Sequence, residues 1–188
     1  MAKIFVISGL SGAGKDSVIE GLKKSGLDYT QIITTTTRSM RSNESQGKPY
    51  YFVSEEEFKR MISENKFFEW AVVYDHYYGN TREEVAQALK KNKPVILRID
   101  VQGAQTIKEN FPEAIVIFLS VSSPEIIAQR LKKRGEDKAA AIKTRLKKIA
   151  IEMKTLDQWD YVIINQQGKL KETIAQVKNI IETEFNKK

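Results

Sequence analysis

Short apolar runs alternate with stretches in which apolar residues recur every three or four positions along most of this 188-residue chain. The apolar runs are rich in Val or Ile and predict strands at residues 3–8, 29–33, 94–99, 115–120 and 161–164. The three- and four-residue spacing predicts helices at residues 17–24, 83–91, 102–110, 124–134, 138–155 and 170–185. This alternation predicts an α/β fold with a parallel sheet covered on both faces, and a ligand at the carboxyl ends of its strands.

Two segments depart from this regular alternation. Residues 34–80 are rich in polar and aromatic side chains, contain a Gly47-Lys48-Pro49 turn, and show only one clear helix, at residues 55–63. We interpret them as a lobe inserted into the α/β core. Residues 132–148 are highly charged, which by itself indicates a solvated helical face.

The residues after the first apolar run, Gly9 to Ser17, match seven of the eight positions of a P-loop. Its three glycines permit backbone conformations that turn successive N–H groups around a phosphate, above the positive end of a helix. The expected triphosphate-binding residues are Ser11, Gly12, Ala13, Gly14, Lys15, Asp16 and Ser17. Lys15 is expected to reach the β- and γ-phosphates. The pattern therefore predicts a nucleoside triphosphate substrate, against the alternative of a tight turn with a solvated lysine.

Asp16 is the one departure from the P-loop pattern, because Ser or Thr ordinarily follows the lysine and binds Mg²⁺ through its hydroxyl. A carboxylate about 4 Å from a phosphate oxygen costs on the order of 4 kcal/mol at an effective dielectric near 20. A divalent ion between the two reverses that sign, and Mg²⁺ readily accepts carboxylate oxygen. We therefore expect Asp16, with Ser17, to bind Mg²⁺; loss of catalysis is the alternative.

A second anion-binding segment lies at the start of the inserted lobe. Four threonines, residues 34–37, precede Arg38 and Arg41. Guanidinium groups bind phosphate oxygens through paired N–H donors, and hydroxyls complete such a site. The segment therefore predicts a second phosphorylated substrate.

Ordered segments along almost the whole chain resemble the guanylate kinase family. They are Thr36-Thr37-Arg38, residues 47–54, 68–71, 77–79 and 99–103, and Arg134-Gly135 followed by Arg145-Leu146. The resemblance implies a single domain with a P-loop NTPase-type core (1–33, 81–131 and 149–188), a monophosphate-binding lobe (34–80) and a helical lid (132–148). It also implies transfer of a phosphoryl group from ATP to GMP or dGMP, giving ADP and GDP.

The resemblance further implies roles for individual residues. The GMP site would comprise Thr34, Arg38, Arg41, Tyr50 and Tyr78 around the phosphate, Glu69, Asn80 and Thr81 at the guanine, and Asp100 near metal and acceptor. Lys15, Arg38, Arg134 and Arg145 would surround the transferred group, and Asn165 would lie near the adenine of ATP. The chemistry of Glu69 agrees, because a carboxylate accepts from both N1–H and the N2 amine of guanine, whereas adenine offers neither donor.

Three positions differ from the family pattern. Thr34 replaces a serine but keeps the hydroxyl, and Asn80 replaces a Ser or Thr but still offers an amide donor. Arg98 reverses the charge of an acidic residue two positions before Asp100. We treat compensation between Asp16 and Arg98 as a hypothesis that a double substitution tests.

Composition narrows the remaining possibilities. The net charge of +7 is compatible with nucleic-acid binding, but two phosphorylated substrates require cationic residues in any case, and we expect neither nucleic acid nor membrane as a partner. The chain has no cysteine, which excludes disulfides and a thiol nucleophile and suits a reducing compartment. No apolar run approaches the roughly 20 residues that span a bilayer. We expect a cytoplasmic monomer or homodimer.

Two alternatives stay open. Ribose 1,5-bisphosphokinase resembles this chain in a P-loop that also reads Gly-Lys-Asp-Ser, but a sugar phosphate has no base for Glu69 to recognise. Noncatalytic guanylate kinase-like modules of scaffold proteins typically lose the P-loop and the lid arginines, which this chain keeps. Assaying a panel of acceptors separates these readings.

Overall fold

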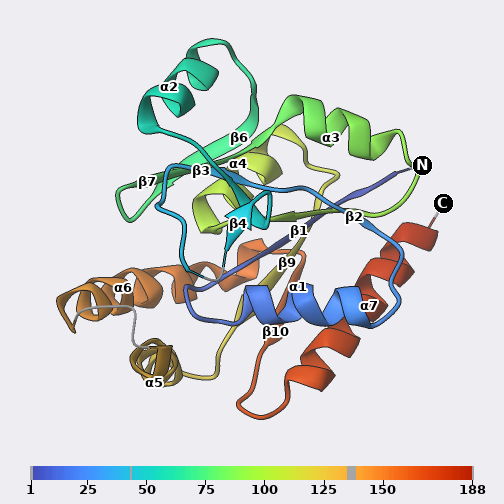
Figure 1. The fold of residues 1–188 in the computed structure, drawn as a ribbon. Helices are drawn as coiled ribbons and strands as arrows, with labels where there is room; N and C mark the ends of the chain where they lie inside the picture. The colour runs from blue at the N-terminus through green and yellow to red at the C-terminus, as the bar shows by residue number, and fades with distance from the viewer. Residues whose placement is uncertain (1, 43, 135–138, 188) are drawn as a thin grey trace. The chain divides into compact units, whose positions relative to one another are not determined.

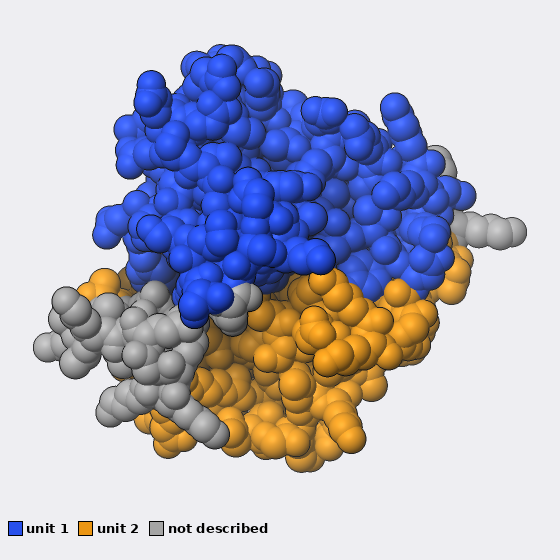
Figure 2. Space-filling view, viewed as in Figure 1, with its two compact units in different colours: residues 1–6, 28–114 blue, residues 7–27, 115–188 orange. Residues whose placement is uncertain are grey.

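The structure is a computed structural model that describes residues 2–42, 44–134 and 139–187. The chain divides into two compact units, which Figure 2 colours separately. Unit 1 comprises residues 1–6 and 28–114, and unit 2 comprises residues 7–27 and 115–188. Strand β1 (Ile4–Gly9) runs from one unit into the other. The division into core, lobe and lid expected from the sequence cuts the chain at different points and stays a prediction.

Unit 1 contains a pair of parallel strands. Strand β2 (Thr30–Gln31) pairs in parallel with β8 (Val95–Arg98), and Lys3 O accepts a hydrogen bond from Val95 N at 2.9 Å. All four residues of β8 are buried, as the apolar run predicted for a strand covered on both faces. Helices α3 (Arg82–Leu89) and α4 (Val101–Asn110) belong to the same unit.

The remaining residues of unit 1 form a second, mixed sheet with the strand order β4-β5-β3-β7-β6. Its strands are β3 (Thr35–Thr36), β4 (Ser45–Gln46), β5 (Pro49–Phe52), β6 (Phe67–Val73) and β7 (His76–Thr81). Strand β3 pairs in parallel with β5 and antiparallel with β7, and β6 and β7 form an antiparallel hairpin. The helix expected at residues 55–63 is confirmed as α2 (Glu55–Ser63). The five strands had not been predicted.

Unit 2 also contains a pair of parallel strands. Strand β9 (Ile115–Ser120) pairs in parallel with β10 (Tyr161–Ile164), and Leu10 N donates to Leu119 O at 3.1 Å just after β1 ends. Helices α1 (Lys15–Lys24) and α7 (Leu170–Asn186) lie side by side (Figure 1). The unit also contains α5 (Pro124–Arg134), α6 (Ala139–Glu152) and a 3₁₀ turn, η1 (Met153–Gln158).

The predicted elements of the α/β part are present, with shifts at their ends. The strand expected at residues 29–33 is only two residues long. The helix expected at residues 138–155 ends at Glu152 and passes into η1, where Thr155 leaves the helical region at φ −112° and ψ 21°. Part of the expected lid, residues 135–138, lies outside the described residues. None of the described helices combines the length and the apolar character that crossing a membrane requires.

Candidate nucleotide-binding sites

The P-loop of unit 2 requires glycine at two positions for separate geometric reasons. Gly9 has φ +141°, and a Cβ there would lie 2.1 Å from Leu119 O. Gly14 has φ +101°, and a Cβ there would lie 2.5 Å from Asn165 Nδ2. Real side chains do not tolerate such contacts at positive φ. The glycines found in the sequence are therefore needed for the loop to follow this path.

Helix α1 begins directly after the loop with no side chain capping its first N–H groups. An uncapped helix start offers N–H donors and a positive dipole end to an anion. Lys15 lies in the first turn, and its Nζ donates to Gly9 O at 2.6 Å and to Leu10 O at 3.3 Å. Asp16 and Ser17 follow it and are exposed. The loop therefore has the donors that a triphosphate tail needs.

Two side chains of unit 2 donate hydrogen bonds to backbone carbonyls of the P-loop. Asn165 Nδ2 donates to Ala13 O at 2.7 Å, and Asn165 Oδ1 accepts from the Thr173 hydroxyl at 3.1 Å. Arg130 donates through Nη1 to Ala13 O at 3.3 Å and to Gly12 O at 3.4 Å, and through Nη2 to Asn165 O at 2.9 Å. Burial lowers the pKa of Arg130. Sequence reasoning missed Arg130, although it stands one helical turn before Arg134.

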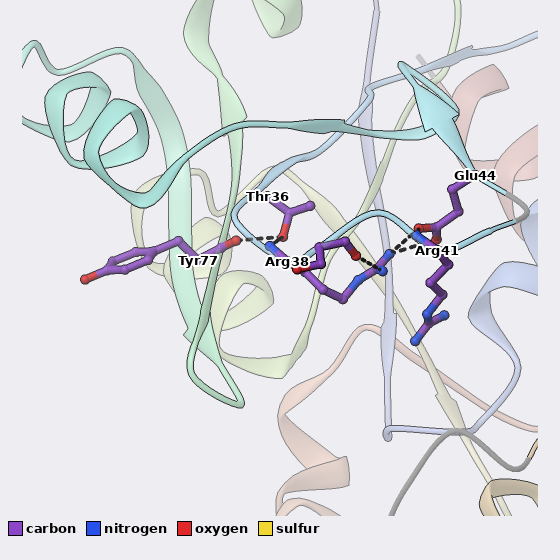
Figure 3. Close-up of polar contacts among 6 residues, drawn as sticks. Thr36, Arg38, Arg41, Glu44 and Tyr77 are labelled. Atoms are coloured by element: carbon purple, nitrogen blue, oxygen red, sulfur yellow. Dashed lines mark hydrogen bonds and ion pairs between the residues drawn. The ribbon is translucent and has the colours of Figure 1, made fainter.

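The acceptor-phosphate residues expected from the sequence lie together in unit 1. The Arg38 guanidinium lies 5.4 Å from the centre of the Tyr50 ring, and Tyr50 meets Tyr78 edge to face at 5.9 Å. Arg38 Nη2 also contacts both oxygens of Glu44, at 2.7 and 2.9 Å (Figure 3). Glu44 was not among the predicted site residues.

Arg98 belongs to this same cluster. Its side chain is buried, with 8% exposed, and its guanidinium lies 4.5 Å from the centre of the Tyr50 ring. The Thr34 hydroxyl donates to the backbone carbonyl of Arg98 at 3.4 Å, so Thr34 is engaged with β8 rather than turned to solvent. The charge reversal noted in the sequence therefore places an additional cation beside Tyr50.

A buried carboxylate forms the other part of the unit 1 site. Glu69 on β6 is 5% exposed, and its Oε1 accepts from Asn80 Nδ2 on β7 at 2.6 Å. Burial raises the pKa of Glu69 to about 8, with a smaller contribution from the charge of Asp100, while the bond from Asn80 acts in the opposite direction. Asn80 Oδ1 is fully buried and has no hydrogen-bond partner among the described residues. The pair thus presents acceptor oxygens in a dry environment.

The start of α4 lies next to the Glu69 carboxylate. A Cβ at Gly103 would lie 2.5 Å from Glu69 Oε2, so only glycine leaves room for Glu69 in this position. The Asp100 side chain caps the helix, with Oδ1 accepting from Gly103 N at 3.0 Å. Thr81 was expected to contact a base, but its hydroxyl caps α3 by accepting from Glu84 N at 3.3 Å.

Comparison with known proteins identifies the family that combines these two sites. A family model for guanylate kinase matches residues 1–184 of the chain. The chain belongs to the guanylate kinase family. A guanylate kinase from Caldanaerobacter subterraneus subsp. tengcongensis is 46% identical over 162 residues, which cover 86% of this chain and 79% of that protein. A guanylate kinase from Helicobacter pylori is 42% identical over 175 residues, covering 93% and 85% respectively.

A solved guanylate kinase structure supports the same conclusion. The crystal structure of the guanylate kinase from Anaplasma phagocytophilum matches with a TM-score of 0.80 and 30% identity, covering 99% of this chain and 87% of that one. The predicted α/β fold of the P-loop NTPase type is thereby confirmed.

Two residues that resemble lid arginines of guanylate kinases are not described in full. Arg134 is the last residue of α5 and Arg145 lies within α6. Both side chains lie outside the described part of the structure, so their expected contact with the transferred group stays a prediction.

The candidate ligands suit a metal that is shared with a nucleotide. Asp16 and Ser17 offer exposed oxygen atoms in unit 2, and the expected role of Asp100 in the same metal site stays a prediction. Among the described residues, no group of three or more His, Cys, Asp or Glu side chains could hold a metal ion. Mg²⁺ is ordinarily held by one or two carboxylates together with water and substrate phosphates, so this donor set fits that ion.

Proposed function

We propose that this protein transfers the γ-phosphoryl group of ATP to the phosphate of GMP or dGMP, giving ADP and GDP or dGDP. The observation that carries this proposal is the buried Glu69 carboxylate, which lies in the same compact unit as the Arg38 and Tyr50 phosphate cluster. A base-recognising acid and a phosphate-binding cluster in one unit suit a guanine nucleotide better than a sugar phosphate. Membership of the guanylate kinase family supports the same substrate.

In unit 2, the P-loop would bind the triphosphate of ATP. Backbone N–H groups of the loop and the start of α1 would surround the β-phosphate, except the N–H of Ala13, which donates to Leu10 O at 3.0 Å. Lys15 would exchange its bonds to Gly9 O and Leu10 O for the β- and γ-oxygens, because a charged phosphate is a stronger acceptor than a peptide carbonyl. Arg130 and Asn165 would keep the loop in the shape that makes this possible.

In unit 1, the acceptor nucleotide would be held at both ends. The acceptor phosphate would be bound by Thr34, Arg38, Arg41, Tyr50 and Tyr78. Glu69 would accept from guanine N1–H and N2, with Asn80 beside it. The Thr81 hydroxyl, which also caps α3, would lie at the guanine.

Transfer needs no protein nucleophile. An oxygen of the GMP phosphate attacks the γ-phosphorus, a new P–O bond forms, and the bond between the γ-phosphorus and the β,γ-bridging oxygen breaks, so that ADP leaves with the electron pair. Lys15 and Arg38, with Arg134 and Arg145 from the helical segment, would stabilise the charge that moves during this step. These cations act by position, and no general base is required.

Asp16 and Ser17, with Asp100, would hold a Mg²⁺ ion that arrives with ATP. When bound, such an ion neutralises charge on the β- and γ-phosphate oxygens. Its ligands in this chain differ from the ordinary P-loop, because Asp16 adds a negative charge where a hydroxyl is usual. Nucleic acid and membranes are not needed as partners for this reaction.

A coupled assay of ADP formation from ATP tests the proposal with GMP, dGMP, AMP, UMP and ribose 1,5-bisphosphate as acceptors. We expect turnover with GMP, with dGMP as the possible second acceptor, and at most marginal rates with the other three. Lys15→Met is the control and should abolish turnover with every acceptor. Preferred turnover of ribose 1,5-bisphosphate would contradict the proposal, and so would the absence of turnover with all five.

A further inference from the structure

We propose that Glu44 is a positioning residue of the acceptor site, which holds Arg38 and Arg41 in the arrangement that receives the phosphate of a nucleoside monophosphate. This inference rests on the proposed function. It concerns a residue to which neither the sequence pattern nor the family resemblance had assigned a role. Figure 3 shows the Glu44 carboxylate beside the guanidinium of Arg38 and the backbone of Arg41.

The Glu44 carboxylate contacts the side chain of Arg38 and the backbone of Arg41. Its two oxygens lie 2.7 and 2.9 Å from Arg38 Nη2, and Oε2 also accepts from Arg41 N at 2.9 Å. Glu44 N in turn donates to Arg41 O at 3.1 Å. These reciprocal bonds close a short turn, so one carboxylate fixes both the direction of one guanidinium and the backbone that carries the other.

The Arg38–Glu44 pair is shielded from water, unlike most ion pairs among the residues that the structure describes. Its side chains are 14% and 7% exposed. Burial alone lowers the pKa of Arg38 and raises that of Glu44, but the hydrogen bonds and charges between them reverse both directions. Shielded, charge-assisted bonds of this kind are about twice as strong as neutral ones. Both groups therefore remain charged, and the guanidinium is held in one orientation.

The remaining contacts of Arg38 define which of its donors a phosphate would meet. Nη1 donates to Ser39 O at 2.7 Å, and no further hydrogen bond of this guanidinium occurs among the described residues. Because a guanidinium carries five N–H donors, Nε–H and one hydrogen on Nη1 are left for a ligand. The Tyr50 and Phe52 rings, 5.4 and 5.6 Å from the guanidinium carbon, fix its plane. Glu44 thus determines which edge of Arg38 is presented.

The other end of the segment is held by β7. The Thr36 hydroxyl accepts from Arg38 N at 3.2 Å and donates to Tyr77 O at 2.9 Å (Figure 3). With Thr36 fixing its start and Glu44 its end, the arginine segment, residues 38–41, is ordered before a substrate arrives. Such preorganisation lowers the entropy that binding must otherwise overcome.

The decisive test compares Glu44→Gln with Glu57→Gln. Glu57 makes the same kind of contact, with Arg60 Nη2 at 2.6 and 2.8 Å from its two oxygens, but on the exposed face of α2. For Glu44→Gln we expect the KM for GMP to rise about tenfold or more, because the charge-assisted hydrogen bonds to Arg38 are lost. The KM for ATP should stay unchanged. Glu57→Gln should leave both values unchanged.

Calorimetry separates this inference from the proposed function. Wild-type protein should bind GMP and, more weakly, guanosine; Glu44→Gln should lose affinity for GMP only, because guanosine has no phosphate. An equal loss for guanosine, or unchanged GMP affinity in Glu44→Gln, would overturn the role of Glu44 and leave the proposed function standing. A wild-type protein that binds no GMP would overturn the proposed function itself.

A second variant keeps the test decisive if Glu44→Gln folds poorly. Glu44→Asp retains the charge but is one methylene shorter, so it cannot keep all the contacts with Arg38 and Arg41 N. We expect an intermediate loss of GMP affinity. A double-mutant cycle with Arg38→Lys should be non-additive, because both changes remove the same contact. Additive effects would show that Glu44 does not act through Arg38.

Discussion

Glu69→Gln provides a direct test of the electrostatics of the base site. Gln has nearly the same shape as Glu and keeps an oxygen that can accept from Asn80 Nδ2, so the packing of β6 and β7 should persist. What the substitution removes is a titrating group. In the folded protein, burial raises the pKa of Glu69 from 4.5 to about 8.

The sign of the effect follows from where the proton resides. Between pH 4.5 and 8 the folded protein keeps a proton on Glu69 that the unfolded chain has released. The free energy of unfolding of the wild type therefore falls as pH rises, by about 1.4 kcal/mol per pH unit from this group. Glu69→Gln lacks this dependence. The variant should gain stability relative to wild type by about 3 kcal/mol as pH rises from roughly 5.5 to roughly 7.5.

Urea unfolding of both proteins at about pH 5.5, 6.5 and 7.5 measures this difference. Subtracting the wild-type free energy of unfolding from that of the variant removes the contribution of every group that titrates alike in both. A difference that increases with pH supports the buried, protonated state of Glu69. A difference that stays constant would refute the reasoning, because Glu69 would then titrate as an ordinary exposed carboxylate.

Three further predictions concern Gly9 and Arg130 of unit 2, and the unusual residues Asp16 and Arg98. Gly9→Ala places a Cβ 2.1 Å from Leu119 O, so thermal melts should show a lower Tm and no stabilisation by ATP; a wild-type response would contradict this. Arg130→Met removes bonds to loop carbonyls and should raise the KM for ATP about fivefold but not that for GMP, whereas equal rises would contradict a local role. Asp16→Ser should change the Mg²⁺ dependence of turnover, and an identical Mg²⁺ titration would contradict the role of Asp16 as a metal ligand. Combining Asp16→Ser with Arg98→Asp should be non-additive, and additive effects would contradict compensation between the two residues.

The sequence sufficed where local pattern and structure share a cause. The apolar runs at residues 115–120 and 161–164 coincide with β9 and β10, because a strand buried on both faces must be apolar throughout. The P-loop could also be predicted from the sequence, because its glycines adopt positive φ angles and close contacts that other residues do not tolerate. The helix at residues 55–63 carried its own start signal, with Ser54 accepting from Glu57 N.

The sequence failed where structure depends on distant residues. Strands β3 and β4 are two residues long and carry no period of their own, so their pairing with β5 is visible only in the fold. The link between Arg38 and Glu44 spans six residues of irregular backbone, which no periodicity marks. The burial of Glu69 depends on a glycine in α4 that leaves room for its carboxylate.

The proposed base selectivity and the raised pKa of Glu69 would have the same physical origin, which is the burial of the carboxylate. The Glu69 carboxylate is removed from water and accepts one hydrogen bond, from Asn80 Nδ2, while the amide oxygen of Asn80 has no partner among the described residues. Each such unmade hydrogen bond costs about 1–3 kcal/mol. In the proposed acceptor site, guanine would bring two N–H donors on one edge to these acceptors, whereas adenine would bring a lone pair at N1 and leave them unpaired. The burial that raises the pKa of Glu69 would also make an unpaired carboxylate costly, and this cost would favour guanine over adenine. A site that held Glu69 in water would bind both bases with similar affinity.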